Sequence, residues 1–119
     1  MKADLYGSSD ARVRELKVAL RALADVSRLR IVSALAEGAE TTVSELARAV
    51  KISQPLLSWH LGFLRRAGLV DTRRKGRAVY CSLNRERWQW TLAELKALAT
   101  PLGSPGEPQT KAVLIGNEE

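Results

Sequence analysis

The sequence predicts a mainly α fold with a small β-hairpin, and three consecutive patterns in residues 42–83 lead to this prediction. A short capped helix (TVSELARAV) is followed by a three-residue turn, and a second helix (QPLLSWHLGFLRRAG) begins directly after the turn. Two strands joined by a basic turn (LVDTRRKGRAVYCSL) come next. This order predicts a winged helix-turn-helix, an α+β fold of about five helices in which the hairpin is the wing.

Length and composition are those of one globular domain. The chain has 119 residues, and 45% of them are hydrophobic, which is sufficient for a single core. We expect the domain to span residues 9–100 and residues 101–119 to form a flexible tail. The sequence shows no membrane-spanning run, no signal peptide and a single cysteine. It therefore predicts a cytoplasmic protein without an intrachain disulfide, a metal site or a cofactor.

The basic charge is concentrated on the helix-turn-helix and the wing. Residues 48–77 contain eight basic residues and one acidic residue, whereas the rest of the chain carries a net charge of −1. A focused positive surface attracts polyanions, so double-stranded DNA is the expected partner. The alternative is a winged helix that serves as a protein-binding adaptor. An enzyme is not predicted, because no nucleophile–base pair, phosphate loop or metal cluster is visible.

Capping signals predict where the central helices begin and end. Ser27 is the expected N-cap of a helix over residues 28–37, which Gly38 would end. The core residues expected in this helix are Leu29, Ile31, Val32 and Leu35. Thr42 and Glu45 form a capping-box pattern for the next helix. Ser53 is the expected cap of the second helix of the motif, with Pro55 in its first turn and Gly68 closing it.

Two amphipathic helices flank the motif and predict a dimer interface. One is expected over residues 9–24, after a frayed lead, and the other over residues 85–100, capped by Asn84. A minimal winged helix has no obvious use for their apolar stripes, so a second copy of the chain is the expected partner. The predicted interface residues are Leu16, Leu20, Leu23, Trp88, Leu92 and Leu95.

The helix beginning at Gln54 is the expected recognition helix. Leu57, Leu61 and Leu64 face inward by spacing, which leaves positions 54, 55, 58, 59 and 62 outward. Gln54 can bond both edges of an adenine, and Ser58 can reach a base or a phosphate; the alternative for each is a solvated surface residue. Trp59 is expected to pack on thymine methyls or sugar, or to fold back over the wing. His60 is expected to pack or hydrogen-bond inside the protein, with a DNA contact as the alternative.

The wing supplies a basic tip and a single thiol. Gly76 permits the turn between Arg74 and Arg77, and this tip is expected to contact phosphates or the minor groove. Cys81 is expected to be a small buried residue on the inner face of the second strand. A redox role would require an exposed thiolate of low pKa, which nothing in the sequence beyond the general positive charge indicates.

These stretches resemble the ArsR/SmtB family of bacterial and archaeal transcriptional repressors. The matching segments are LRALADVSRLRIVSALAEG, TVSELARAV, ISQPLLSWHLGFLRRAGLV and RRKGRAVYCSL, which fall within about residues 16 to 83. The resemblance implies a homodimer, paired through the first and last helices, that binds a pseudo-palindromic operator. Where the family usually has glycine in the turn, this chain has Lys51, which must accept a glycine-like backbone or shift the turn. The DNA-binding residues predicted from the motif and the resemblance are Lys51, Ser53, Gln54, Pro55, Ser58, Trp59, Arg65, Arg74, Lys75 and Arg77.

The resemblance does not extend to the metal sites of the family. Many members release DNA when a metal binds a Cys-x-Cys pair on the third helix, but this chain reads Thr42-Val43-Ser44-Glu45-Leu46 there. Other members use Asp and His pairs on the last helix, where this chain has Glu86, Glu94 and no histidine. Soft metals require Cys or His ligands, so no metal response is predicted and the inducer stays unknown.

Overall fold

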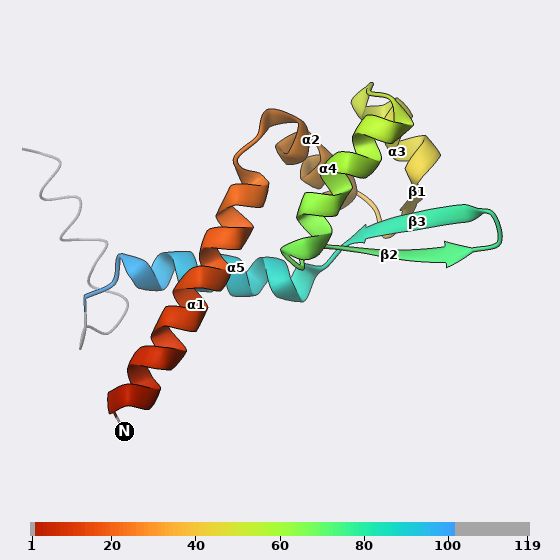
Figure 1. Cartoon of the computed structure of the whole chain (residues 1–119). Coiled ribbons are helices and arrows are strands. Elements are labelled where there is room, and N and C mark those ends of the chain that lie inside the picture. Colours follow the sequence, from red (N-terminus) through yellow and green to blue (C-terminus); the bar gives the residue numbers. More distant parts are fainter. Residues whose placement is uncertain (1, 102–119) are drawn as a thin grey trace, which may run out of the picture.

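A computed structural model of the protein describes residues 2–101, with side chains from residue 10 onward. In Figure 1 the two terminal helices cross, and a hairpin projects away from the helices between them. The elements are α1 (Lys2–Leu23), α2 (Val26–Ala36), β1 (Thr41–Thr42), α3 (Val43–Val50), α4 (Gln54–Arg66), β2 (Val70–Lys75), β3 (Ala78–Leu83) and α5 (Arg85–Leu98). The predicted mainly α winged helix-turn-helix with five helices is confirmed.

The core lies where α2, α3, α4 and the base of the wing meet. Its largest fully buried side chains are Ile31, Leu46, Leu57, Leu64, Leu69, Val70 and Cys81. Ala47 is also buried, and its small side chain suits the place where α3 packs against α4. The inward spacing predicted for α4 is therefore correct.

The sheet has one strand more than the sequence predicted. β3 pairs with β2 over the whole hairpin, from Val70 opposite Leu83 to Lys75 opposite Ala78. On its other side β3 pairs with β1, with Thr41 opposite Cys81. A two-residue strand is too short to produce an alternating pattern, and its pairing with β3 is not local. Because α3 begins directly after β1, this pairing connects the start of α3 to the wing.

Several predicted boundaries near the N-terminus were wrong. The first helix begins at Lys2, not Ser9, because glycine and serine cost an established helix only about 1 kcal/mol or less each. α2 is capped by Asp25, not Ser27: the Asp25 carboxylate accepts a hydrogen bond from the Arg28 amide at 3.1 Å. Gly38 is not a left-handed cap, since α2 ends at Ala36 and Glu37 keeps a right-handed conformation.

One predicted core residue of α2 is on the surface. Leu29 is 51% exposed, whereas Ile31, Val32 and Leu35 are buried as expected. The inner face of α2 begins at Arg28, which is only 9% exposed, and Leu29 lies about 100° further around the helix. The predicted tail, apart from Pro101, lies outside the described residues. In the described part of the chain, no helix is both long and apolar enough to cross a bilayer.

Candidate nucleic-acid interface

Local hydrogen bonds set the geometry of the helix-turn-helix. The predicted capping box is present: the Glu45 amide donates to Thr42 Oγ1 at 3.1 Å, and the Thr42 amide donates to Glu45 Oε1 at 3.3 Å. The hydrogen bonds that the Thr42 amide and the Thr41 hydroxyl donate to the Glu45 carboxylate lower its pKa. Ser53 caps α4 as predicted by accepting from the Leu56 amide, and Pro55 occupies the first turn.

Lys51 forms the turn between α3 and α4 with a left-handed backbone, at φ 61° and ψ 48°. This conformation favours glycine, because a side chain with a Cβ is strained there. The chain therefore keeps the usual turn at some cost in backbone energy, and an exposed lysine stands beside the start of α4.

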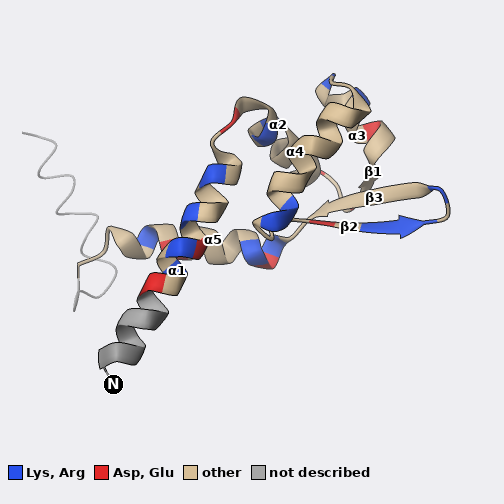
Figure 2. Ribbon diagram, in the orientation of Figure 1, with Lys and Arg blue, Asp and Glu red and all other residues tan. Residues whose placement is uncertain are grey.

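Every side chain predicted to contact DNA is exposed. These residues are Lys51, Ser53, Gln54, Pro55, Ser58, Trp59, Arg65, Arg74, Lys75 and Arg77. Figure 2 shows basic residues along the outer part of β2, in the turn at the tip of the wing, and at the C-terminal end of α4. The positive surface predicted from the sequence therefore faces solvent.

A hollow of about 490 Å³ brings the recognition helix and the wing together. Gln54, Ser58 and Arg65 line it from α4, and Arg77 lines it from the wing. Val43 and Ser44 line it from the start of α3. Residues predicted separately as base-reading and phosphate-binding thus share one surface. The hollow does not include Lys51, Ser53, Pro55, Trp59, Arg74 or Lys75.

The amide of Gln54 is held by a residue that the sequence did not single out. Gln54 Nε2 donates to Ser44 Oγ at 2.8 Å, and this bond fixes the orientation of the Gln54 amide, including its side-chain oxygen. Ser44 lies ten positions earlier, on α3, so only the packing of α3 against α4 brings the pair together. The bond restricts the rotamers of a long side chain at the surface.

One arginine of the basic run is already paired. The Arg73 guanidinium forms two hydrogen bonds with the Glu40 carboxylate, at 2.7 Å and 3.0 Å. This contact lowers the pKa of Glu40 and raises the pKa of Arg73. Arg74, Lys75 and Arg77 form no ion pair within the described part of the chain, so they are the wing cations free to meet a phosphate.

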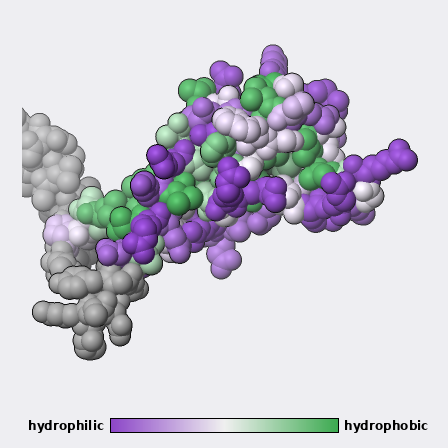
Figure 3. All heavy atoms as spheres, viewed as in Figure 1, coloured by the Kyte–Doolittle hydropathy of each residue, from purple (hydrophilic) through white to green (hydrophobic). Residues whose placement is uncertain are grey.

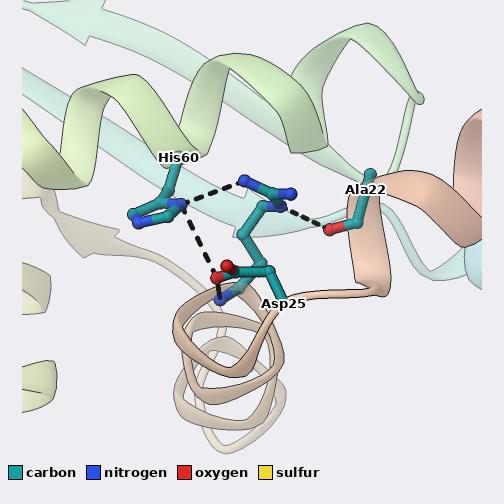
Figure 4. Close-up of polar contacts among 4 residues, drawn as sticks. Ala22, Asp25 and His60 are labelled. Atoms are coloured by element: carbon teal, nitrogen blue, oxygen red, sulfur yellow. Dashed lines mark hydrogen bonds and ion pairs between the residues drawn. The ribbon is translucent and has the colours of Figure 1, made fainter.

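The two ring residues of α4 have different environments. Trp59 is 58% exposed, and its ring lies edge-on to His60 and Phe63, with centroids 5.1 Å and 4.8 Å away. It does not fold over the wing, because these neighbours belong to its own helix. His60 is 6% exposed, and its Nδ1 lies 3.1 Å from Arg28 Nη1 (Figure 4). The internal hydrogen-bonding role expected for His60 is confirmed, and the alternative of a DNA contact is not supported.

The terminal helices cross and expose an apolar surface. Ion pairs join them within the protomer, Arg12 to Glu94 at 3.1 Å and Arg87 to Glu15 at 2.9 Å. Beside the crossing lies an almost wholly apolar hollow of about 350 Å³, lined in part by Val13, Leu20 and Leu98. Figure 3 shows hydrophobic residues gathered along the outer end of α5 and near its crossing with α1.

The six predicted interface residues divide between this surface and the interior. Leu20, Leu92 and Leu95 are 38%, 51% and 41% exposed. Leu16 is 3% exposed, and Leu23 and Trp88 are partly buried against the core of their own protomer. The exposed residues are therefore the ones that a second copy of the chain would cover.

Cys81 is fully buried, as predicted, and burial raises the pKa of its thiol to about 11. The thiol is thus protonated at neutral pH and is a poor nucleophile and metal ligand. Among the described residues, no group of three or more His, Cys, Asp or Glu side chains is placed to hold a metal ion.

Known proteins resemble this chain in both sequence and fold. The model of the family described as bacterial regulatory protein, arsR family, matches residues 25–72. The chain is 42% identical to the arsenic resistance transcriptional regulator ArsR1 of Pseudomonas putida over 81 residues, which are 68% of this chain and 63% of ArsR1. It is also 42% identical to the transcriptional activator HlyU of Vibrio cholerae over 67 residues, which are 56% of this chain and 61% of HlyU. The chain thus spans somewhat less than two thirds of the length of these curated relatives.

Solved structures agree with this assignment. HlyU superposes with a TM-score of 0.58 and 35% identity, over 73% of this chain and 94% of the HlyU chain. The homodimeric winged helix-turn-helix DNA-binding domain of a possible ArsR-family regulator from Mycobacterium bovis has a TM-score of 0.63 and 28% identity, over 75% of this chain and 83% of that one. On the family match, these identities and the shared fold, the chain belongs to the ArsR family of bacterial regulatory proteins.

Proposed function

We propose that the protein is a sequence-specific DNA-binding transcriptional regulator that represses by occupying a pseudo-palindromic operator as a homodimer. The observation that carries the proposal is the shared hollow, in which Gln54 and Ser58 of α4 lie beside Arg77 of the wing. A helix of 13 residues is about 20 Å long and fits the major groove, while basic side chains on the wing neutralise phosphates.

The dimer gives this interface its expected spacing. Two recognition helices related by a two-fold axis reach major grooves about 34 Å apart, one turn of the duplex. The exposed apolar surface on α1 and α5 supports pairing through these helices, as does the homodimeric state of the similar domain from Mycobacterium bovis. Repression is proposed because a bound dimer would block access to the promoter. The relative HlyU is named as a transcriptional activator, so the reporter experiment below measures whether expression falls or rises.

Selection of bound fragments from the genome of the source organism tests the proposal. Purified protein is expected to enrich a small set of fragments that share an inverted repeat, and to shift them in a gel more tightly than random DNA. A reporter placed behind the enriched sequence is expected to lose expression when the protein is supplied. Failure to enrich any sequence, with equal weak binding to all DNA, would favour the protein-binding adaptor instead.

Replacing Gln54 by alanine is expected to relax discrimination at one base pair of each half-site. Gln54 is positioned by Ser44, and a bidentate amide contact to adenine contributes about 1–3 kcal/mol of selectivity. Competition binding against operators changed at each position measures the effect. Ser44→Ala is the matched variant: it keeps the Gln54 amide but frees it, so a smaller loss at the same base pair is expected. An equal loss on specific and random DNA after Gln54→Ala would contradict base reading.

Zinc, cadmium and arsenite are expected to leave the DNA affinity unchanged at one equivalent per protomer. The single thiol, Cys81, is fully buried and protonated at neutral pH, and the single histidine, His60, is 6% exposed. Neither side chain is presented as a soft-metal ligand. Fluorescence anisotropy of labelled operator DNA during a metal titration provides the measurement. Release of DNA at a 1:1 ratio would contradict the absence of a metal response.

A further inference from the structure

A second hollow lies away from the DNA-facing surface, between the end of α1, the start of α2 and α4. Its volume is about 490 Å³, within the range of small-molecule sites. Three arginines line it, Arg21, Arg28 and Arg66, together with apolar side chains that include Val18 and Phe63. It shares no lining residue with the hollow formed by the recognition helix and the wing. No acidic residue lines it, so its electrostatic character is cationic.

Arg28 is the unusual member of this set, because its charge is buried without a counter-ion. The residue is 9% exposed, and its Nε donates to the Ala22 carbonyl at 2.6 Å (Figure 4). Its Nη1 lies against His60, and its guanidinium carbon lies 4.3 Å from the centre of the Phe63 ring. None of the four ion pairs among the described residues includes Arg28. A buried cation lacking an anionic partner is costly, and a bound anion would offset that cost.

The nearest acidic side chain in the sequence is already engaged. The Asp25 carboxylate accepts from the Arg28 backbone amide at 3.1 Å and lies 3.9 Å from His60 Nδ1. It caps α2 and does not come within 4.0 Å of the Arg28 guanidinium. Nη2 of Arg28 donates no hydrogen bond to a described residue. Among the described residues no buried side-chain nitrogen lacks a hydrogen-bond partner, so Nη2 is open to solvent, from which a ligand can reach it.

The Arg66 guanidinium also lies over the Phe63 ring and lines the hollow. Its guanidinium carbon is 4.9 Å from the centre of the Phe63 ring, and its side chain is exposed. Arginine presents parallel N–H groups that match a carboxylate, and a pair of them holds it more firmly than one. Val18 and Ala22 add apolar lining from α1. The lining is thus suited to a molecule with a carboxylate at one end and an apolar frame.

We propose that this hollow is a binding site for a small organic carboxylate, held by Arg28 and Arg66 with its apolar part against Val18 and Ala22. The hollow adjoins the surface expected to pair, because Arg21 and Ala24 line both hollows, but Val18 points about 200° around α1 from Leu20 and so faces away from that surface. The ligand would touch the recognition helix at Phe63. Any effect of the carboxylate on DNA binding rests on the proposed function, whereas binding of the carboxylate to the hollow does not.

Isothermal titration calorimetry of the full chain without DNA tests the site. The probes are benzoate, phenylacetate and hexanoate, each compared with its neutral amide at low ionic strength. At least one carboxylate is expected to bind once per protomer with a Kd below about 1 mM, and its amide at least about tenfold more weakly. Binding by none of the acids, or equal binding of acid and amide, would overturn the proposal.

Matched arginine variants and one tryptophan locate the bound carboxylate. Arg66→Gln is expected to weaken binding at least about tenfold. Arg30→Gln removes an exposed arginine of α2 that lies outside the hollow, and it is expected to change nothing. Trp59 packs against Phe63, so its emission should shift on binding, and Trp59→Phe should abolish that signal while Trp88 and Trp90 are retained. Equal losses in both arginine variants would overturn the placement. These titrations contain no DNA. A protein that fails to bind an operator can therefore still be shown to bind a carboxylate, and a protein that binds no carboxylate can still be shown to bind an operator.

Discussion

Binding to DNA is expected to weaken by about 10⁴-fold as the salt concentration rises from about 50 mM to about 200 mM. The free cations of the wing, Arg74, Lys75 and Arg77, and Arg65 of α4 give four phosphate contacts per protomer. Eight contacts in a dimer release counterions with a slope of about −7 in a plot of log K against log salt. A flat response would contradict the electrostatic account of affinity.

The double variant Arg74→Ala/Lys75→Ala separates phosphate contacts from base contacts. It removes four contacts per dimer, so the slope should fall in magnitude to about −3.5, and specific and random DNA should lose affinity alike. Fluorescence anisotropy at several salt concentrations measures both quantities. A loss confined to the specific operator would assign these side chains to base reading instead.

The ion pair on the wing offers a matched control for that variant. Replacing Arg73 and Glu40 together by alanine removes an arginine from the same strand but leaves the net charge unchanged. Because the Arg73 guanidinium is occupied by Glu40, this pair is expected to leave the slope near −7. A fall as large as that of the Arg74 and Lys75 variant would mean that Arg73 exchanges Glu40 for a phosphate.

This control depends on a contact that the sequence did not reveal. Glu40 and Arg73 lie 33 positions apart, and β1 and β3 bring them together through non-local pairing. The same is true of Arg28 and His60, which are 32 positions apart. In the sequence Arg73 belongs to the same basic run as Arg74, Lys75 and Arg77. Only the fold distinguishes it from the three free cations beside it.

Local signals, by contrast, were predicted accurately. The capping box of Thr42 and Glu45, the Ser53 cap and the Asn84 cap each depend on a hydrogen bond between residues three apart. Gly68 and Gly76 have positive φ values, as their turns require. Such features need no knowledge of distant residues. The prediction failed at Ser27 because Asp25 is an equally good cap two positions earlier and carries the negative charge that a helix N-terminus favours.

The recognition residues were predicted as a set, but their relation was not. Spacing placed Gln54 and Ser58 on the outer face of α4, and the structure confirms their exposure. Spacing did not show that Ser44 holds Gln54, or that Arg77 shares a hollow with both. Both relations come from the packing of α3 and the wing around α4. The sequence therefore identified the side chains, and the tertiary structure supplies their arrangement.

Leu92→Glu is expected to dissociate the dimer and to lower affinity for a full operator by about 10²-fold or more. Leu92 lies on α5 and is 51% exposed in the single chain, beside the other exposed apolar residues of the terminal helices. A glutamate there would be buried against a partner without a counter-charge, and this is costly. Two half-site contacts made by one rigid dimer bind more tightly than either contact alone, and a monomer loses that gain.

Leu29→Glu is the matched control, since Leu29 on α2 is also 51% exposed. In the isolated protomer the two substitutions place the same charge on equally exposed leucines, so they differ only in what a second copy of the chain covers. Analytical ultracentrifugation should show a monomer for Leu92→Glu and a dimer for Leu29→Glu, with circular dichroism confirming that both remain folded. If Leu92→Glu stays dimeric, or if Leu29→Glu dissociates instead, pairing through α1 and α5 is wrong. The two-fold relation between recognition helices would then have to come from another face.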